Sequence, residues 1–77
     1  MQLTSKDGTM VVDYYPIKND SQFIYKVLKF QGIKTMSTKC ITKKDFEYEC
    51  RERLGLGYKV TGFNTEIAEV NPMNGAC

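Results

Sequence analysis

One segment of the chain has apolar residues at helical spacing, and we predict a helix over residues 43–54. Thr42 is suited to cap this helix, because its hydroxyl can accept a hydrogen bond from the backbone N–H of Asp45. Gly55 is expected to end it in a left-handed conformation. One stripe of the predicted helix carries the apolar residues Phe46, Cys50 and Leu54 together with Arg53.

Most other apolar residues lie in segments rich in β-branched and aromatic side chains, which is typical of strands. Residues 9–15 form the first clear strand, and Pro16 is expected to stop it or to confine it to a sheet edge. Residues 3–5 are expected to pair back on it as a short hairpin. Residues 58–63 and 66–70 are predicted strands after the helix.

Residues 23–30 fit two structures. As a helix they place Phe23, Ile24, Val27 and Leu28 on one stripe, whereas as a strand their apolar residues occupy both faces. Their Phe, Ile, Tyr and Val content favours a strand, and the Thr-rich residues 33–41 provide a hairpin partner. We therefore predict a strand here and keep the helix as the alternative.

This order of elements predicts an α+β fold, a small antiparallel β-sheet of about four to five strands with a single α-helix packed on one face. We predict one domain over residues 1–72 and a flexible C-terminal tail over residues 73–77. One helix covers one face of such a sheet, so the other face meets solvent, a second chain or a partner.

Composition then restricts the chemistry. The 77 residues include three cysteines but no histidine, which excludes Ser-His and Cys-His pairs and histidine zinc sites. Cys40, Cys50 and Cys77 lack CxxC spacing, and no cofactor motif is present. Lysine, tyrosine and carboxylates can still catalyse, but we predict a non-enzymatic protein without cofactor or metal.

The expected location is the cytoplasm. No apolar run approaches the roughly 20 residues of a membrane helix, and the first residues lack the layout of a secretory signal. The odd number of cysteines favours a reducing compartment, so we expect all three thiols to be free.

Charge is unevenly distributed although the net charge is only +2. Residues 1–44 carry eight lysines and three aspartates, a net charge of +5, whereas residues 45–77 have a net charge of −3. The lysine-rich hairpin of residues 26–44 could follow a nucleic-acid backbone while Phe23 or Tyr25 stacks on bases. Alternatively, its lysines are solvated and protect edge strands from aggregation. These lysines are Lys26, Lys29, Lys34, Lys39, Lys43 and Lys44.

Tyrosines and helix glutamates offer a different interface. Neighbours in a strand point to opposite faces, so one of Tyr14 and Tyr15 is expected in the core and the other on the surface, beside Tyr25. An exposed tyrosine patch is favoured at protein interfaces. The glutamates could dock on a basic surface, or they form an ordinary solvated helix face.

We predict a small intracellular binding protein that inhibits or modulates a larger host complex by occluding its surface. The expected source is a phage or other mobile element, with an anti-CRISPR-like protein as one example and nucleic-acid-handling or defence machinery as targets. A homodimer is compatible with this prediction, and no membrane contact is expected. The alternative is a nucleic-acid-binding regulator that uses the hairpin of residues 26–44, and a small nuclease-like enzyme is the third hypothesis. The predicted partner-binding residues are Tyr14, Tyr15, Tyr25, Lys26, Lys29, Lys34, Lys39, Lys43, Lys44, Glu47, Glu49 and Glu52.

Overall fold

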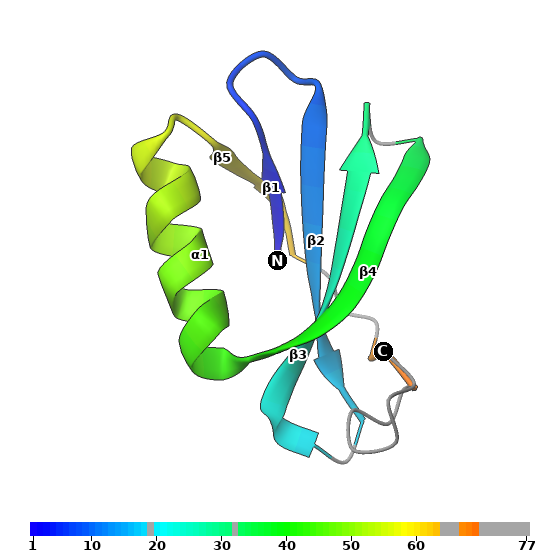
Figure 1. Cartoon of the computed structure of the whole chain (residues 1–77). Helices are drawn as coiled ribbons and strands as arrows, with labels where there is room; N and C mark the ends of the chain where they lie inside the picture. Colours follow the sequence, from blue (N-terminus) through cyan, green and yellow to red (C-terminus); the bar gives the residue numbers. More distant parts are fainter. Residues whose placement is uncertain (19, 32, 64–66, 70–77) are drawn as a thin grey trace.

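In the part of the chain that the structure describes, five antiparallel strands form one sheet, and a single helix packs on one of its faces (Figure 1). The computed structural model describes residues 1–18, 20–31, 33–63 and 67–69. The strands lie in the order β4-β3-β2-β1-β5, and every pair is antiparallel. This arrangement confirms the predicted α+β class. In chain order the elements are β1 (Gln2–Thr4), β2 (Met10–Ile17), β3 (Asp20–Phe30), β4 (Lys34–Thr42), α1 (Lys43–Gly55) and β5 (Lys59–Gly62).

The ambiguous segment of residues 23–30 is a strand. It lies within β3, which pairs with β2 on one side and with β4 on the other. Ile24 and Lys26 therefore share the face that carries α1, and Tyr25 and Val27 share the opposite face. The strand prediction is confirmed, and the helical alternative is wrong.

The core lies between α1 and the sheet. Phe46 and Cys50 of the predicted apolar stripe pack against it, and the Phe46 ring meets the Tyr14 ring edge-on at 4.9 Å between centroids. Thr42 caps α1, accepting a hydrogen bond from the N–H of Asp45 at 3.1 Å. No residue of α1 is fully buried, so the helix depends on few apolar contacts. The buried core residues are Leu3, Val12, Tyr14, Ile24 and Ile41.

The prediction for Gly55 is wrong. Gly55 is the last helical residue, and the cap is Leu56 in a right-handed conformation with φ −85°. The helix runs one residue further because the Leu56 N–H still reaches the carbonyls of Glu52 and Arg53. The left-handed residue is Gly57, with φ +97°.

The prediction for Pro16 is also wrong. β2 continues through Pro16 to Ile17 and lies inside the sheet, between β3 and β1. Proline is tolerated because its missing N–H faces the side where β1 has already ended. On that side the Pro16 carbonyl accepts from the N–H of Ala68 at 2.9 Å.

The segment after β5 differs from the expected strand of residues 66–70. Among its described residues, 67–69, Ala68 forms an isolated parallel bridge with Ile17. The predicted tail of residues 73–77 lies outside the described residues. Within the described ranges, no helix combines the length and apolar character that crossing a bilayer requires.

The prediction that all thiols are free is wrong. Cys40 is disulfide-bonded, whereas Cys50 is a free, half-buried thiol. The prediction failed because cysteine number and spacing do not reveal which sulfur atoms meet in the fold.

Candidate functional site: the open face of the sheet

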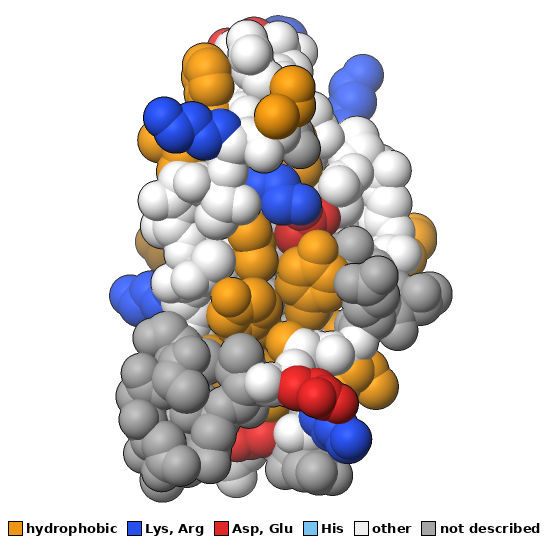
Figure 2. All heavy atoms as spheres, turned by 90° about the vertical axis from the view of Figure 1, so that its right-hand side faces the viewer, with side chains coloured by type: hydrophobic (Ala, Val, Ile, Leu, Met, Phe, Trp, Pro, Cys, Tyr) orange, Lys and Arg blue, Asp and Glu red, His pale blue; other side chains and the backbone are white. Residues whose placement is uncertain are grey.

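The face of the sheet opposite α1 is the candidate site, and we call it the open face. Figure 2 shows this side of the molecule, where hydrophobic side chains gather in the centre beneath a basic and an acidic side chain. The strand registers place alternate residues of each strand on it. From β1 to β5 the open face carries Gln2, Thr4, Val11, Asp13, Tyr15, Tyr25, Val27, Lys29, Thr35, Thr38, Cys40 and Thr61.

Tyr15 and Tyr25 form the aromatic part of the open face. They are direct cross-strand neighbours in β2 and β3, and their ring centroids lie 6.3 Å apart with a tilt of 41°. Both side chains are half-buried beside a cavity of about 380 Å³. We call its apolar lining the aromatic cradle, which consists of Tyr15, Tyr25, Val27, Ile67 and Ala68. Lys29, Thr35 and Thr38 complete the lining with polar groups.

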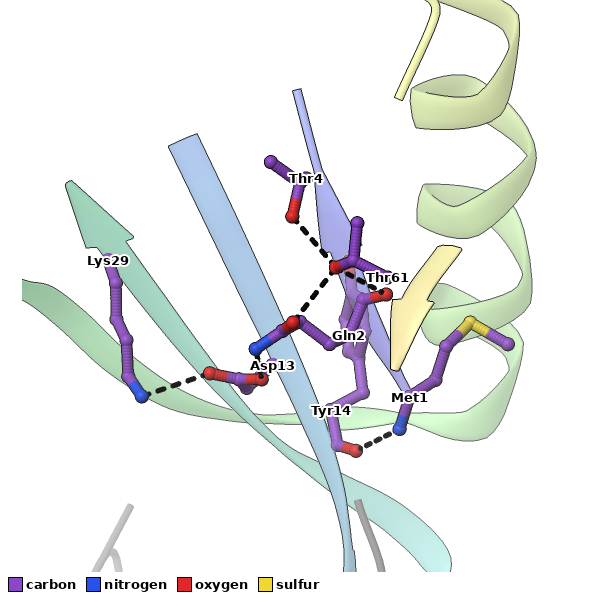
Figure 3. A network of polar contacts seen from close by, with 7 residues as sticks. All are labelled: Met1, Gln2, Thr4, Asp13, Tyr14, Lys29 and Thr61. Atoms are coloured by element: carbon purple, nitrogen blue, oxygen red, sulfur yellow. Dashed lines mark hydrogen bonds and ion pairs between the residues drawn. The ribbon is translucent and has the colours of Figure 1, made fainter. Parts of the chain in front are cut away.

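A chain of polar contacts crosses four strands beside the cradle (Figure 3). The Lys29 Nζ lies 3.1 Å from Asp13 Oδ2, and the Gln2 amide donates to Asp13 Oδ1 at 3.1 Å. The Thr61 hydroxyl donates to Gln2 Oε1 at 2.9 Å and lies 2.8 Å from the Thr4 hydroxyl. Asp13 is only 1% exposed, so the Lys29 ammonium and the Gln2 amide compensate a buried carboxylate. The chain therefore fixes Lys29 at the rim of the cavity.

Three of the predicted site residues instead hold α1 on the sheet. Tyr14 is 1% exposed, and its hydroxyl donates to Glu49 Oε1 at 3.0 Å. The same oxygen lies 2.7 Å from Lys26 Nζ and 3.2 Å from an Arg53 guanidinium nitrogen. Burial raises the pKa of Tyr14 well above its ordinary value, so the phenol remains a donor at neutral pH. Tyr14, Lys26 and Glu49 are thus withdrawn from the surface that a partner could contact.

The other predicted charged residues remain on the surface. Among the described residues, none of Lys34, Lys39, Lys43 and Lys44 forms an ion pair, and all four are exposed. Glu47 and Glu52 are exposed on α1. The structure therefore divides these predicted residues into three groups. Tyr15, Tyr25 and Lys29 lie on the open face. The exposed lysines lie on β4 and at the start of α1, and the two glutamates lie on the surface of α1.

Sequence reasoning missed most of the open face, since only Tyr15, Tyr25 and Lys29 of its residues were predicted. Asp13 was visible as a lone charge inside a β-rich run, which is a signal for a paired buried group. Gln2, Thr61, Ile67 and Ala68 gave no comparable signal, because they reach the site through pairing between distant segments.

The described residues hold no cluster of three or more histidine, cysteine, aspartate or glutamate side chains that could bind a metal. Comparison with protein-family models, with curated proteins and with solved structures finds no match. The functional argument therefore rests on the geometry of the open face and on the charges around it.

Proposed function

We propose that this chain is a small non-enzymatic binding protein that covers a surface of a larger protein partner, with the aromatic cradle at the centre of contact. The observation that carries this proposal is the half-buried pair Tyr15 and Tyr25 beside a cavity of about 380 Å³ on the face that α1 leaves uncovered. Aromatic residues beside a pocket are typical of interface centres, and threonine and lysine groups suit the rim.

The proposal extends to inhibition or modulation of a host complex by a phage-type protein in the cytoplasm. Its support is the small size of the chain and its lack of histidine chemistry. The disulfide at Cys40 weighs against a reducing location, because disulfides are rare in the cytosol. Rapid alkylation of thiols in intact cells, followed by mass spectrometry of Cys40, distinguishes a reducing compartment, where Cys40 is alkylated, from an oxidising one, where it is not.

The proposal is tested by quantitative co-purification from host lysate with three forms of the protein. The wild type and Tyr48→Ala should enrich the same partner, because Tyr48 is 61% exposed on α1 and lies outside the open face. Tyr25→Ala should reduce the enrichment by about tenfold, the loss of about 1.4 kcal/mol of binding free energy. Equal enrichment by Tyr25→Ala, or no enriched protein with the wild type, would contradict the proposal.

A second candidate function, nucleic-acid binding, is favoured by the four exposed lysines of β4 and the α1 start. They form no ion pair among the described residues, whereas Lys26 and Lys29 of the same hairpin are occupied by carboxylates. A gel shift that weakens steeply with salt and is lost in the double variant Lys34→Glu, Lys39→Glu would support it. No shift even at low salt would remove it.

A further inference from the structure

In the described part of the chain, three connections between elements meet at one end of the molecule (Figure 1). They join β1 to β2, β3 to β4 and α1 to β5, because β1, β3 and α1 run towards this end and the elements that follow start from it. The Gln31 N–H donates to the Thr9 carbonyl at 2.6 Å, and a Cβ on Gly57 would lie 3.3 Å from Lys6 Cδ, so the three connections contact one another. We call this surface, together with the last turn of α1, the loop end, which consists of residues 5–9, 30–31, 33–36 and 52–59.

The loop end exposes large apolar side chains. Ile33 is 86% exposed and Leu56 is 72% exposed, so both stand outside the core. Met36 is the extra residue of a bulge in β4 and is also exposed. Exposed apolar groups that gather in this way mark a surface that meets an apolar partner. The exposed large apolar residues of the loop end are Phe30, Ile33, Met36, Leu54 and Leu56.

Lysines lie at the same end as these apolar groups. Lys6, Lys34 and Lys59 are exposed, and none of them forms an ion pair with another described residue. Residues 5–9, 30–36 and 52–59 contain four basic and two acidic residues, a net charge of +2. The carboxylate of one of these acids, Asp7, accepts three hydrogen bonds from its own turn. The loop end therefore complements a partner that is apolar within and anionic at its surface.

A bilayer with anionic headgroups has both of these properties. Its boundary between headgroups and acyl chains takes up apolar side chains, and its negative surface attracts lysines. The apolar groups of the loop end come from separate connections, and a fluid bilayer receives them at any spacing, whereas a protein partner would need recesses that match their positions. A second copy of the chain would bring lysines towards lysines, which is unfavourable.

We propose that the loop end docks on an anionic phospholipid surface. Ile33 and Leu56 enter the boundary between headgroups and acyl chains, and the exposed lysines lie among the phosphates. The inference is independent of the proposed function, because the aromatic cradle contributes no residue to the loop end. The expectation of no membrane contact rests on the lack of a spanning run and of a secretory signal, and neither bears on a surface that lies on headgroups.

The test is co-sedimentation of the whole chain with large vesicles at low ionic strength. Vesicles of phosphatidylcholine with one third phosphatidylserine should bind the protein at least about tenfold more strongly than vesicles of phosphatidylcholine alone, because each lysine near an anionic surface strengthens binding about fivefold. Ile33→Ala should weaken binding to the anionic vesicles by about tenfold, since less apolar surface enters the boundary. Tyr48→Ala, which removes an exposed side chain from the middle of α1, is the matched control and should bind like the wild type. No binding to the anionic vesicles, or equal binding of Ile33→Ala and the wild type, would overturn the proposal.

Two further pairs of variants locate the contact. Lys34→Glu should weaken binding by about tenfold or more, whereas Lys44→Glu, which makes the same charge change at the opposite end of the molecule, should have a much smaller effect. The chain has no tryptophan, so Ile33→Trp introduces a single reporter whose emission should shift to the blue on the anionic vesicles, and that of Tyr48→Trp should not. Equal effects of the two lysine variants, or no blue shift of Ile33→Trp, would overturn the proposal. Loss of a co-purifying protein in Ile33→Ala, without vesicle binding by the wild type, would overturn the lipid surface and assign the loop end to a protein partner.

Discussion

At the scale of single residues, Glu49 connects the helix to the sheet. One of its carboxylate oxygens accepts from Tyr14 and lies within ion-pair distance of Lys26 and Arg53. Since no residue of α1 is fully buried, the polar contacts of Glu49 supplement the small apolar contact between α1 and the sheet. A hydrogen bond to a charged group contributes about 1.5–3 kcal/mol when it is shielded from water, and somewhat less at this partly exposed oxygen.

Tyr14→Phe should therefore lower the free energy of unfolding by about 1–2 kcal/mol, as measured by urea unfolding. The ring and its contact with Phe46 remain, so the loss reports the hydroxyl alone. Tyr48→Phe on the exposed side of α1 is the matched control and should change nothing. Equal stability of Tyr14→Phe and the wild type would show that the junction does not hold the helix.

Alkaline pH should weaken the same junction. Burial raises the pKa of Tyr14 above its ordinary value of 10, so the folded state holds this proton more tightly than the unfolded state. The resulting stabilisation is complete below pH 10 and decreases as the pH rises beyond it. Urea midpoints of the wild type should fall from pH 9 to pH 11 more steeply than those of Tyr14→Phe, and parallel curves would contradict this assignment.

The turn between β1 and β2 should respond to acid in the opposite direction. Asp7 accepts from the Thr9 N–H at 3.0 Å and from the hydroxyls of Thr9 and Ser5 at 2.7 Å each, which lowers its pKa to about 2. The turn is therefore held fully above pH 3.8, the ordinary pKa, and loosens as the pH falls towards 2. NMR titration of the Asp7 carboxyl carbon tests this, and a midpoint near 3.8 would contradict it.

At the scale of elements, predictability depended on how local the determining contacts are. The helix was placed to within one residue, because the Thr42 cap and the Phe46–Cys50 spacing lie within the segment itself. The strand character of β3 followed from its composition. Pro16 was misjudged because its tolerance depends on where another strand, β1, ends. The bulge at Met36 depends on register and left no signal in the sequence.

The site was less predictable for the same reason. Sequence reasoning selected Tyr15 and Tyr25, but only the register shows that they face each other. It also treated the hairpin lysines as one set, whereas Lys29 forms an ion pair with Asp13 of β2 and Lys26 forms one with Glu49 of α1. Ion pairs between distant segments cannot be read from charge spacing along the chain.

Amide exchange should differ between the two sides of β4. The N–H groups of Lys39 and Ile41 face β3, whereas that of Thr38 faces outward. Hydrogen exchange of the free protein, followed by NMR, should therefore be slow at Lys39 and Ile41 and faster at Thr38. Equal protection of Thr38 and Lys39 would contradict this register.

At the scale of the whole molecule, the sheet has two unequal faces. One supports α1 over a core cluster that has five buried members among the described residues, and the other exposes an aromatic cavity with a polar chain beside it. A domain with so small a core has a narrow stability margin, and a covalent link matters more in it than in a large protein. The disulfide at Cys40 therefore bears on both stability and location.

Reduction of the folded protein should lower its free energy of unfolding by about 2–4 kcal/mol, the usual contribution of a native disulfide. Cys40 is disulfide-bonded and Cys50 is free, so alkylation in denaturant without reductant, followed by mass spectrometry, should modify Cys50 but leave Cys40 unmodified until the protein is reduced. Cys40→Ser is the control, because its stability should no longer respond to reductant. Alkylation of Cys40 before reduction, with a urea midpoint that reductant leaves unchanged, would contradict the disulfide and remove the objection to a reducing compartment.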